Sequence, residues 1–110
     1  MRALLDECVT RRIKRDFPGH EVHTVEEAGM KGFKNGELLH SASGRYDVLV
    51  RVDKIIPYQQ NVKSLTIAIL ILSAKRNAYD SLRPLMPEAL EALKQISPGD
   101  VIIIGESESN

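Results

Sequence analysis

The sequence predicts a three-layer α/β protein, in which a central, mostly parallel sheet of about five strands is covered by helices on both faces. The first observation is that short apolar runs alternate with helical patterns, because strands separated by helices imply a parallel sheet. The second is the apolar run 67–72, with the sequence IAILIL. A continuous run of this kind is typical of a strand that is buried on both faces.

The order of the elements follows from these patterns. Strands are expected at 2–5, 21–25, 47–52, 66–72 and 101–104. Apolar residues recur at a helical spacing over 9–17, between the first two strands. Asn35 suits the cap of a second helix that continues to residue 42. A last helix is expected within 80–96, because proline and glycine at 98 and 99 would end it.

Length and composition limit the classes of protein. The chain of 110 residues suits one domain, which we expect over 1–105 with a polar tail at 106–110. Basic and acidic residues number 15 each, so no global field attracts nucleic acid or a membrane. Cys8 is the only cysteine, so no disulfide can form within the chain, which fits a reducing compartment. We expect Cys8 to be a small buried residue on the first helix. We expect a cytoplasmic protein without a membrane-spanning segment, because the longest apolar run is too short to cross a bilayer.

Acidic residues gather where the predicted strands end. Asp6 follows the first strand and Asp53 the third, and Glu37 lies near the start of a helix that could reach the same edge. Ligand sites in open parallel sheets form outside the carboxyl ends of the strands. Clustered carboxylates repel one another unless a divalent cation neutralises them, and Mg²⁺ or Mn²⁺ prefers such oxygen ligands. These acids are therefore candidates for a metal site.

Four short motifs carry a resemblance to a known family. They are LLDE at 4–7, PGHEV at 18–22, NGELL at 35–39 and DVLVRVDK at 47–54. Together they resemble the PIN-like family of small nucleases, which includes relatives of the virulence-associated toxins of toxin–antitoxin pairs. The resemblance implies a PIN fold and RNA cleavage that depends on Mg²⁺ or Mn²⁺. It also implies that Asp6, Glu37 and Asp53 bind the metal and carry catalysis, that a small antitoxin protein is a partner, and that a homodimer can form.

Arg51 departs from the pattern of that family. Such proteins usually have a small hydroxyl residue two positions before the third acid, where this chain has Arg51. Residues 51 and 53 of a strand point to the same face. Arg51 could therefore pair with Asp53 and compete with a metal, or it could bind the scissile phosphate. Asp80 is a candidate for a fourth acid, although its position also suits the cap of the last helix.

Basic residues could contact the phosphates of an RNA substrate. Four of them follow the first strand at 11–15, and others fall in loops near the acidic edge. The candidates are Arg11, Arg12, Arg15, Lys54 and Lys75. The same cluster at 11–15 would also suit a solvated helix face opposite the apolar stripe.

Two rival functions use the same residues. A receiver-like phosphoacceptor domain also has acids after its first strand, an aspartate after its third and a hydroxyl residue after its fourth, as Asp53 and Ser73 would supply. Only 19 residues separate Asp53 from Ser73, which leaves little room for a full helix and the following strand and counts against a receiver-like domain. A PIN-like scaffold that has lost activity and binds a protein partner is the other rival, which Arg51 suggests.

Overall fold

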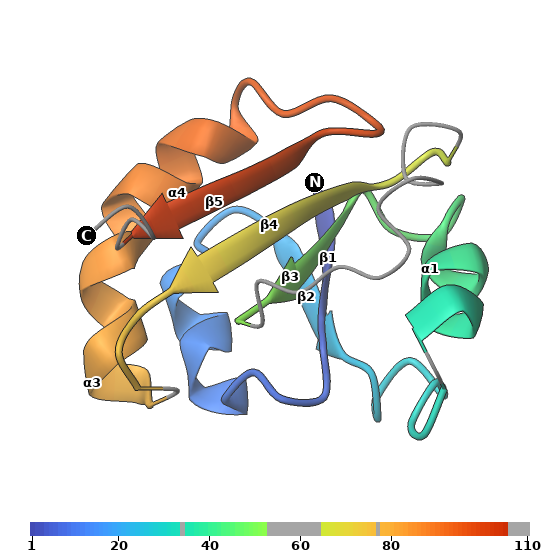
Figure 1. Cartoon of the computed structure of the whole chain (residues 1–110), viewed down its shortest axis with the longest axis horizontal. Helices are drawn as coiled ribbons and strands as arrows, with labels where there is room; N and C mark the ends of the chain where they lie inside the picture. Colours follow the sequence, from blue (N-terminus) through green and yellow to red (C-terminus); the bar gives the residue numbers. More distant parts are fainter. Residues whose placement is uncertain (34, 53–64, 77, 106–110) are drawn as a thin grey trace.

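A five-stranded parallel sheet forms the centre of the protein (Figure 1). The structure is a computed structural model that describes residues 1–33, 35–52, 65–76 and 78–105. The strands lie in the order β2-β1-β3-β4-β5, and every neighbouring pair is parallel. They are β1 (Arg2–Leu5), β2 (Glu21–Thr24), β3 (Val48–Arg51), β4 (Ala68–Ser73) and β5 (Val101–Gly105). The predicted α/β class and the five predicted strands are confirmed.

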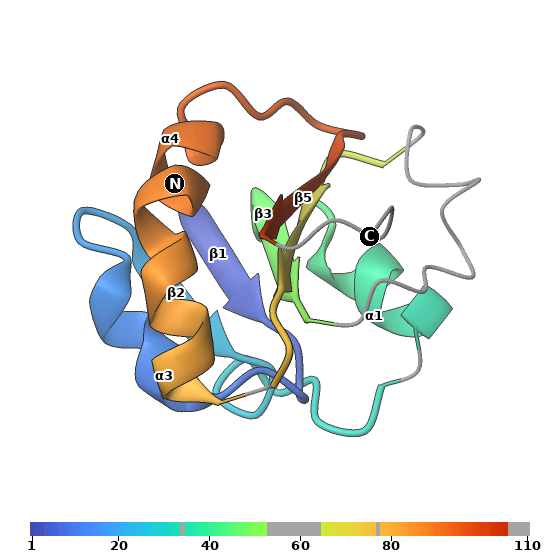
Figure 2. The same cartoon turned by 60° about the vertical axis from the view of Figure 1, so that its left-hand side comes forward.

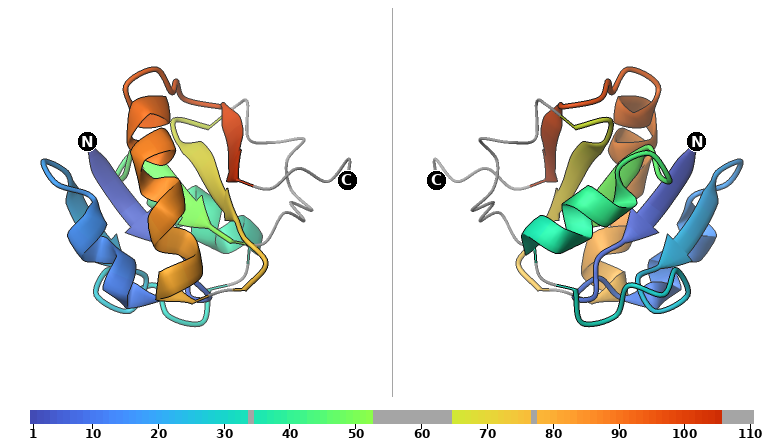
Figure 3. Two further views of the ribbon diagram at one scale, coloured as in Figure 1. Left: turned by 90° about the vertical axis from the view of Figure 1, so that its left-hand side faces the viewer. Right: turned by 90° about the vertical axis from the view of Figure 1, so that its right-hand side faces the viewer.

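Helices cover both faces of this sheet. One face carries the 3₁₀ helix η1 (Arg11–Asp16) and the segment formed by α3 (Tyr79–Leu82), η2 (Arg83–Leu85) and α4 (Met86–Leu93). The other face carries α1 (Asn35–Ala42). Figures 2 and 3 show α1 and α4 on opposite sides of the strands, so the arrangement has three layers.

Side chains on the two faces of the sheet pack into two separate hydrophobic cores. Leu5 and Val50 pack beneath η1 and α4, whereas Leu4 and Leu49 pack beneath α1. All six residues of β4 are buried, because this strand lies between β3 and β5 and is covered on both sides. Burial of β4 on both faces therefore explains its uninterrupted apolar sequence, from which a central strand was predicted.

The crossover between β4 and β5 has the opposite hand from those between the earlier strands. The chain steps from β1 to β2 across the face of η1, and then in the opposite direction from β2 to β3 across the face of α1, so these two crossovers share one hand. From β4 to β5 the chain moves in the same direction as from β2 to β3, but the connecting helices α3 and α4 lie on the same face as η1. Receiver-like folds have the same strand order. Parallel crossovers are right-handed in about 98% of cases, so the hand of the last crossover separates this layer arrangement from theirs.

Several local expectations differ from the structure. The segment 11–16 forms a 3₁₀ helix, and Cys8 lies exposed in the turn before it rather than buried on a helix. The last helix is divided into three short pieces because Pro84 and Pro87 each sit at the first turn of a new piece. Asp80 lies in the first turn of α3, whereas Ala78 occupies the cap position. Across the described ranges, no helix is long and apolar enough to cross a membrane.

Gly105 is required where β5 ends beside β4. Its φ angle is +113°, and a Cβ atom there would collide with the carbonyl oxygen of Ser73. We expect Gly105→Ala to lower the free energy of unfolding by about 1–3 kcal/mol through backbone strain. Urea denaturation measures it, with Gly36→Ala as the control because a Cβ at Gly36 meets open space. Equal stability of the two variants would contradict the expectation.

Candidate functional site

The pairing of β1 with β3 brings two charged side chains together at the carboxyl edge of the sheet. Leu5 is the partner of Val50 in the register, and the amide of Asp6 extends the ladder by donating to the Val50 carbonyl at 2.9 Å. The next position along both strands places Asp6 beside Arg51. Because side chains alternate along a strand, this pair faces the same side as Leu4 and Leu49, which is the side of α1.

Asp6 and Arg51 form a buried ion pair. Arg51 Nε lies 2.8 Å from Asp6 Oδ2, and only 5% of the Arg51 side chain and 12% of the Asp6 side chain are exposed. The other carboxylate oxygen, Oδ1, accepts a hydrogen bond from the Glu7 amide at 2.7 Å. Both oxygens of Asp6 are therefore engaged by the protein itself. Water screens a buried pair less than a surface pair, so the two charges are strongly coupled.

The ion pair lies at the point where the strand order reverses. From β1 the chain goes to β2 on one side, and it returns to β3 on the other side by a crossover on the opposite face. Crevices outside the carboxyl ends of two such strands are the usual ligand sites of open parallel sheets. The sequence therefore placed Asp6 at the correct edge, while the structure adds Arg51 as its neighbour.

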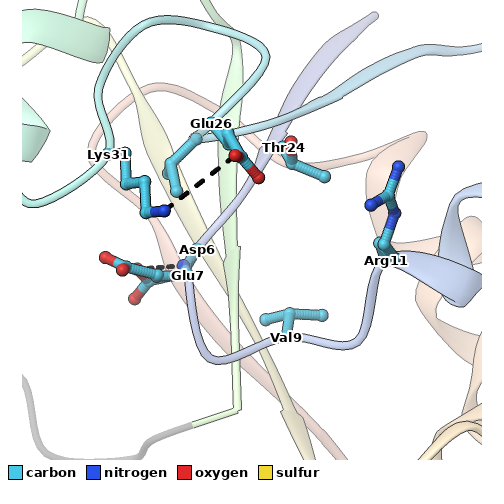
Figure 4. A pocket seen from close by; sticks show the side chains of 8 residues that line it. Asp6, Glu7, Val9, Arg11, Thr24, Glu26 and Lys31 are labelled. Atoms are coloured by element: carbon cyan, nitrogen blue, oxygen red, sulfur yellow. Dashed lines mark hydrogen bonds and ion pairs between the residues drawn. The ribbon is translucent and has the colours of Figure 1, made fainter.

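A pocket of about 150 Å³ opens beside Asp6 (Figure 4). Lys31 reaches toward Glu26, with its Nζ 4.0 Å from Glu26 Oε2, and Arg11 lies across the opening from it. The pocket is lined by Asp6, Glu7, Val9, Arg11, Thr24, Val25, Glu26 and Lys31. These residues come from the turn after β1, the start of η1, the end of β2 and the loop after β2. The lining mixes both signs of charge with valine side chains.

A reciprocal pair of hydrogen bonds fixes the loop after β2. The Thr24 amide donates to Glu27 Oε1 at 2.9 Å, and the Glu27 amide donates to Thr24 Oγ1 at 3.1 Å. Lys14 of η1 adds an ion pair to the same carboxylate at 2.9 Å. This contact was not expected from the sequence, although the spacing of Thr24 and Glu27 is that of a capping box and could have revealed it. The pocket wall is thus tied to η1.

The three predicted acids have different outcomes. Asp6 is at the centre of the site, whereas Glu37 is exposed in the first turn of α1 and does not line the pocket. Asp53 lies outside the described residues, as does Lys54. Within the described ranges, no three histidine, cysteine, aspartate or glutamate side chains are placed to hold a metal ion. With Asp6 paired to Arg51, the described residues do not fit Mg²⁺ or Mn²⁺, and metal binding through all three acids stays a prediction.

The predicted basic residues that the structure describes do not form one surface. Arg11 borders the pocket, whereas the guanidinium carbons of Arg12 and Arg15 lie 4.8 and 5.8 Å from the centre of the Tyr79 ring. A hydrogen bond to the Asp16 carboxylate raises the pKa of the Tyr79 hydroxyl. Lys75 borders a separate hollow of about 210 Å³ at the end of β4. Arg12 and Arg15 thus hold η1 against α3, and only part of the predicted cluster faces the site.

Cys8 is close to the site but has the properties of an unreactive thiol. Cys8 is exposed, but nearby protein atoms partly shield its thiol from water, which raises the pKa of Cys8, and the negative charge of Asp6 raises it further. A thiol is nucleophilic only as the thiolate. Cys8 is therefore protonated at neutral pH, and the site offers no cysteine nucleophile there.

No family model, no curated protein and no solved structure matches this chain.

The ion pair can be measured by a double-mutant cycle. Arg51→Met leaves the Asp6 carboxylate buried without its cation, and we expect it to lower the free energy of unfolding by about 3–5 kcal/mol. Asp6→Asn combined with Arg51→Met should cost less than the two single changes added together, by about 0.5–3 kcal/mol. Arg76→Met is the control at an exposed arginine near the same edge. Strict additivity would show that the two charges are not coupled.

Glu27 predicts an acid-labile contribution to stability. The pKa of Glu27 is lowered from 4.5 to about 2, mainly by its hydrogen bond with Lys14 and next by its hydrogen bond with the Thr24 amide. A lowered pKa stabilises the fold above the unfolded value, so this contribution is present above pH 4.5 and is lost as the pH falls toward 2. In Glu27→Gln, the fall of unfolding free energy over that range should be shallower than in the unaltered protein. Urea denaturation across the range measures it, and Glu26→Gln at the neighbouring exposed carboxylate is the control. An unchanged slope in Glu27→Gln would refute this assignment.

Proposed function

We propose that this chain is a PIN-like domain that acts as a protein-binding module and does not cleave RNA. The observation that carries the proposal is the buried ion pair between Asp6 and Arg51. The resemblance gives Asp6 the role of the first metal-site acid. In this chain, a guanidinium already neutralises that carboxylate, and the positive charge beside it opposes a second cation.

The pocket beside Asp6 supports binding rather than chemistry. Arg11 and Lys31 lie at its opening, Glu7 and Glu26 supply acceptors, and the valine side chains offer apolar contact. A polypeptide segment presents the same mixture of charged, polar and apolar groups. The described lining contains no histidine or cysteine that could act as a base or nucleophile in a cleavage reaction.

A metal-dependent ribonuclease is the second candidate. The placement of Asp6 where the strand order reverses favours it, because that is where catalytic residues of open parallel sheets lie. Arg11 and Lys75, near the ends of β1 and β4, could contact phosphates. If this candidate holds, the toxin of a toxin–antitoxin pair is its natural setting, with an antitoxin protein as the partner.

A cleavage assay separates the two candidates. We expect the purified protein to leave mixed RNA intact with either Mg²⁺ or Mn²⁺, measured by gel electrophoresis over several hours. Asp6→Asn, prepared in the same way, is the control for contaminating nucleases. Metal-dependent cleavage that Asp6→Asn abolishes would overturn the binding-module proposal and establish the ribonuclease.

A positive arm of the same test identifies the class of partner. A photo-crosslinking residue is placed at position 31 in the pocket, and a matched one at position 88, which is exposed on α4. Irradiation in cells should give a discrete adduct at position 31 alone. Digestion by protease but not by ribonuclease is the expected result, and the reverse would indicate RNA at this edge.

A further inference from the structure

We infer that Arg51 is the built-in cation of this site and takes the place at Asp6 that a divalent metal would otherwise occupy. The inference deepens the proposed function, because it assigns the loss of metal dependence to one residue. It rests on the geometry of the ion pair. A guanidinium nitrogen at 2.8 Å from Asp6 Oδ2 occupies the space beside the oxygen that a metal ion would need.

Arg51 is held in position by the centre of the sheet. It is the last residue of β3, between β1 and β4, and it is the register partner of Ile71 on β4. Its side chain is 5% exposed and lies beside the core formed by Leu4, Leu49 and Ile71. An arginine enclosed in this way cannot move into solvent without leaving a buried carboxylate uncompensated. A metal ion in solution therefore meets a site that is already filled.

Charge balance leads to the same conclusion. The Asp6 carboxylate and the Arg51 guanidinium cancel, and Glu7 supplies only its amide to the described contacts of Asp6. Lys31 and Arg11 add positive charge at the opening of the pocket. Bringing a divalent cation next to this group would add repulsion from these cations, and both oxygens of Asp6 already have partners.

Removing Arg51 should therefore create affinity for a metal. Arg51→Thr shortens the side chain, empties the space beside Oδ2 and leaves a hydroxyl oxygen nearby. The Asp6 carboxylate then lacks its positive partner and attracts a cation strongly, and oxygen ligands of this kind suit Mn²⁺. Metal binding here is a property of the altered site and does not require catalysis.

The experiment measures Mn²⁺ binding directly. Free Mn²⁺ is followed by its electron paramagnetic resonance signal during titration of the intact protein, and thermal unfolding is recorded with and without Mn²⁺. We expect Arg51→Thr to bind Mn²⁺ about tenfold or more tightly than the unaltered protein, the scale of one removed charge repulsion. Mn²⁺ should also raise its melting temperature, because a ligand of the native state stabilises it.

Matched variants decide whether the gain belongs to Asp6. Arg51→Thr combined with Asp6→Asn should lose the gained binding, and Lys31→Thr should not acquire it, although it removes a cation from the same pocket. Arg51→Gln is the second variant, in case Arg51→Thr does not fold, because it removes the positive charge and shortens the side chain while keeping a polar group beside Asp6. Circular dichroism confirms folding before each titration.

The outcomes separate this inference from the proposed function. If folded Arg51→Thr and Arg51→Gln both bind Mn²⁺ no better than the unaltered protein, the inference is wrong, while the absence of RNA cleavage still supports the binding module. Tight Mn²⁺ binding by the unaltered protein that Asp6→Asn abolishes would also overturn it. RNA cleavage by the unaltered protein overturns the proposed function whatever the titrations show.

Discussion

The register between β1 and β3 is the constraint on which both the fold and the site depend. With Leu5 opposite Val50, the apolar side chains divide correctly between the two cores and the charged residues meet at the edge. A slip of one residue in β3 would turn Arg51 toward the core beneath η1 and α4, without Asp6 beside it. The ion pair therefore acts as a specificity device for the central strand pair, because only one register satisfies both charges.

The strands and the edge of the site could be predicted because each depends on a local signal. A strand buried on both faces must be apolar throughout, as β4 is, and an aspartate directly after an apolar strand must lie at its carboxyl end. The partner of Arg51 could not be predicted in the same way. Alternation gives the face of its side chain, but identifying Asp6 as its neighbour requires that β1 lies next to β3, which depends on packing across the whole chain.

The basic residues illustrate the same limit. Three of these arginines lie close together in the sequence. On the 3₁₀ helix, however, Arg11 borders the pocket, whereas Arg12 and Arg15 lie over the Tyr79 ring. Tyr79 is far along the chain, so no local pattern indicates that contact. The bonds between Thr24 and Glu27 are the opposite case, since their spacing of three residues is a local motif that sequence reasoning could have used.

A built-in cation changes what the site can do. A metal ion exchanges with solvent, keeps open positions for water or substrate, and can activate either one. A guanidinium has no open coordination position and cannot release a proton at neutral pH, so it can only bind and orient. Because Arg51 is anchored in β3, the positive charge that it brings to Asp6 does not depend on the metal concentration. A surface whose charge is constant is suited to recognising a partner, and this is the physical reason for linking the Asp6–Arg51 pair with binding instead of cleavage.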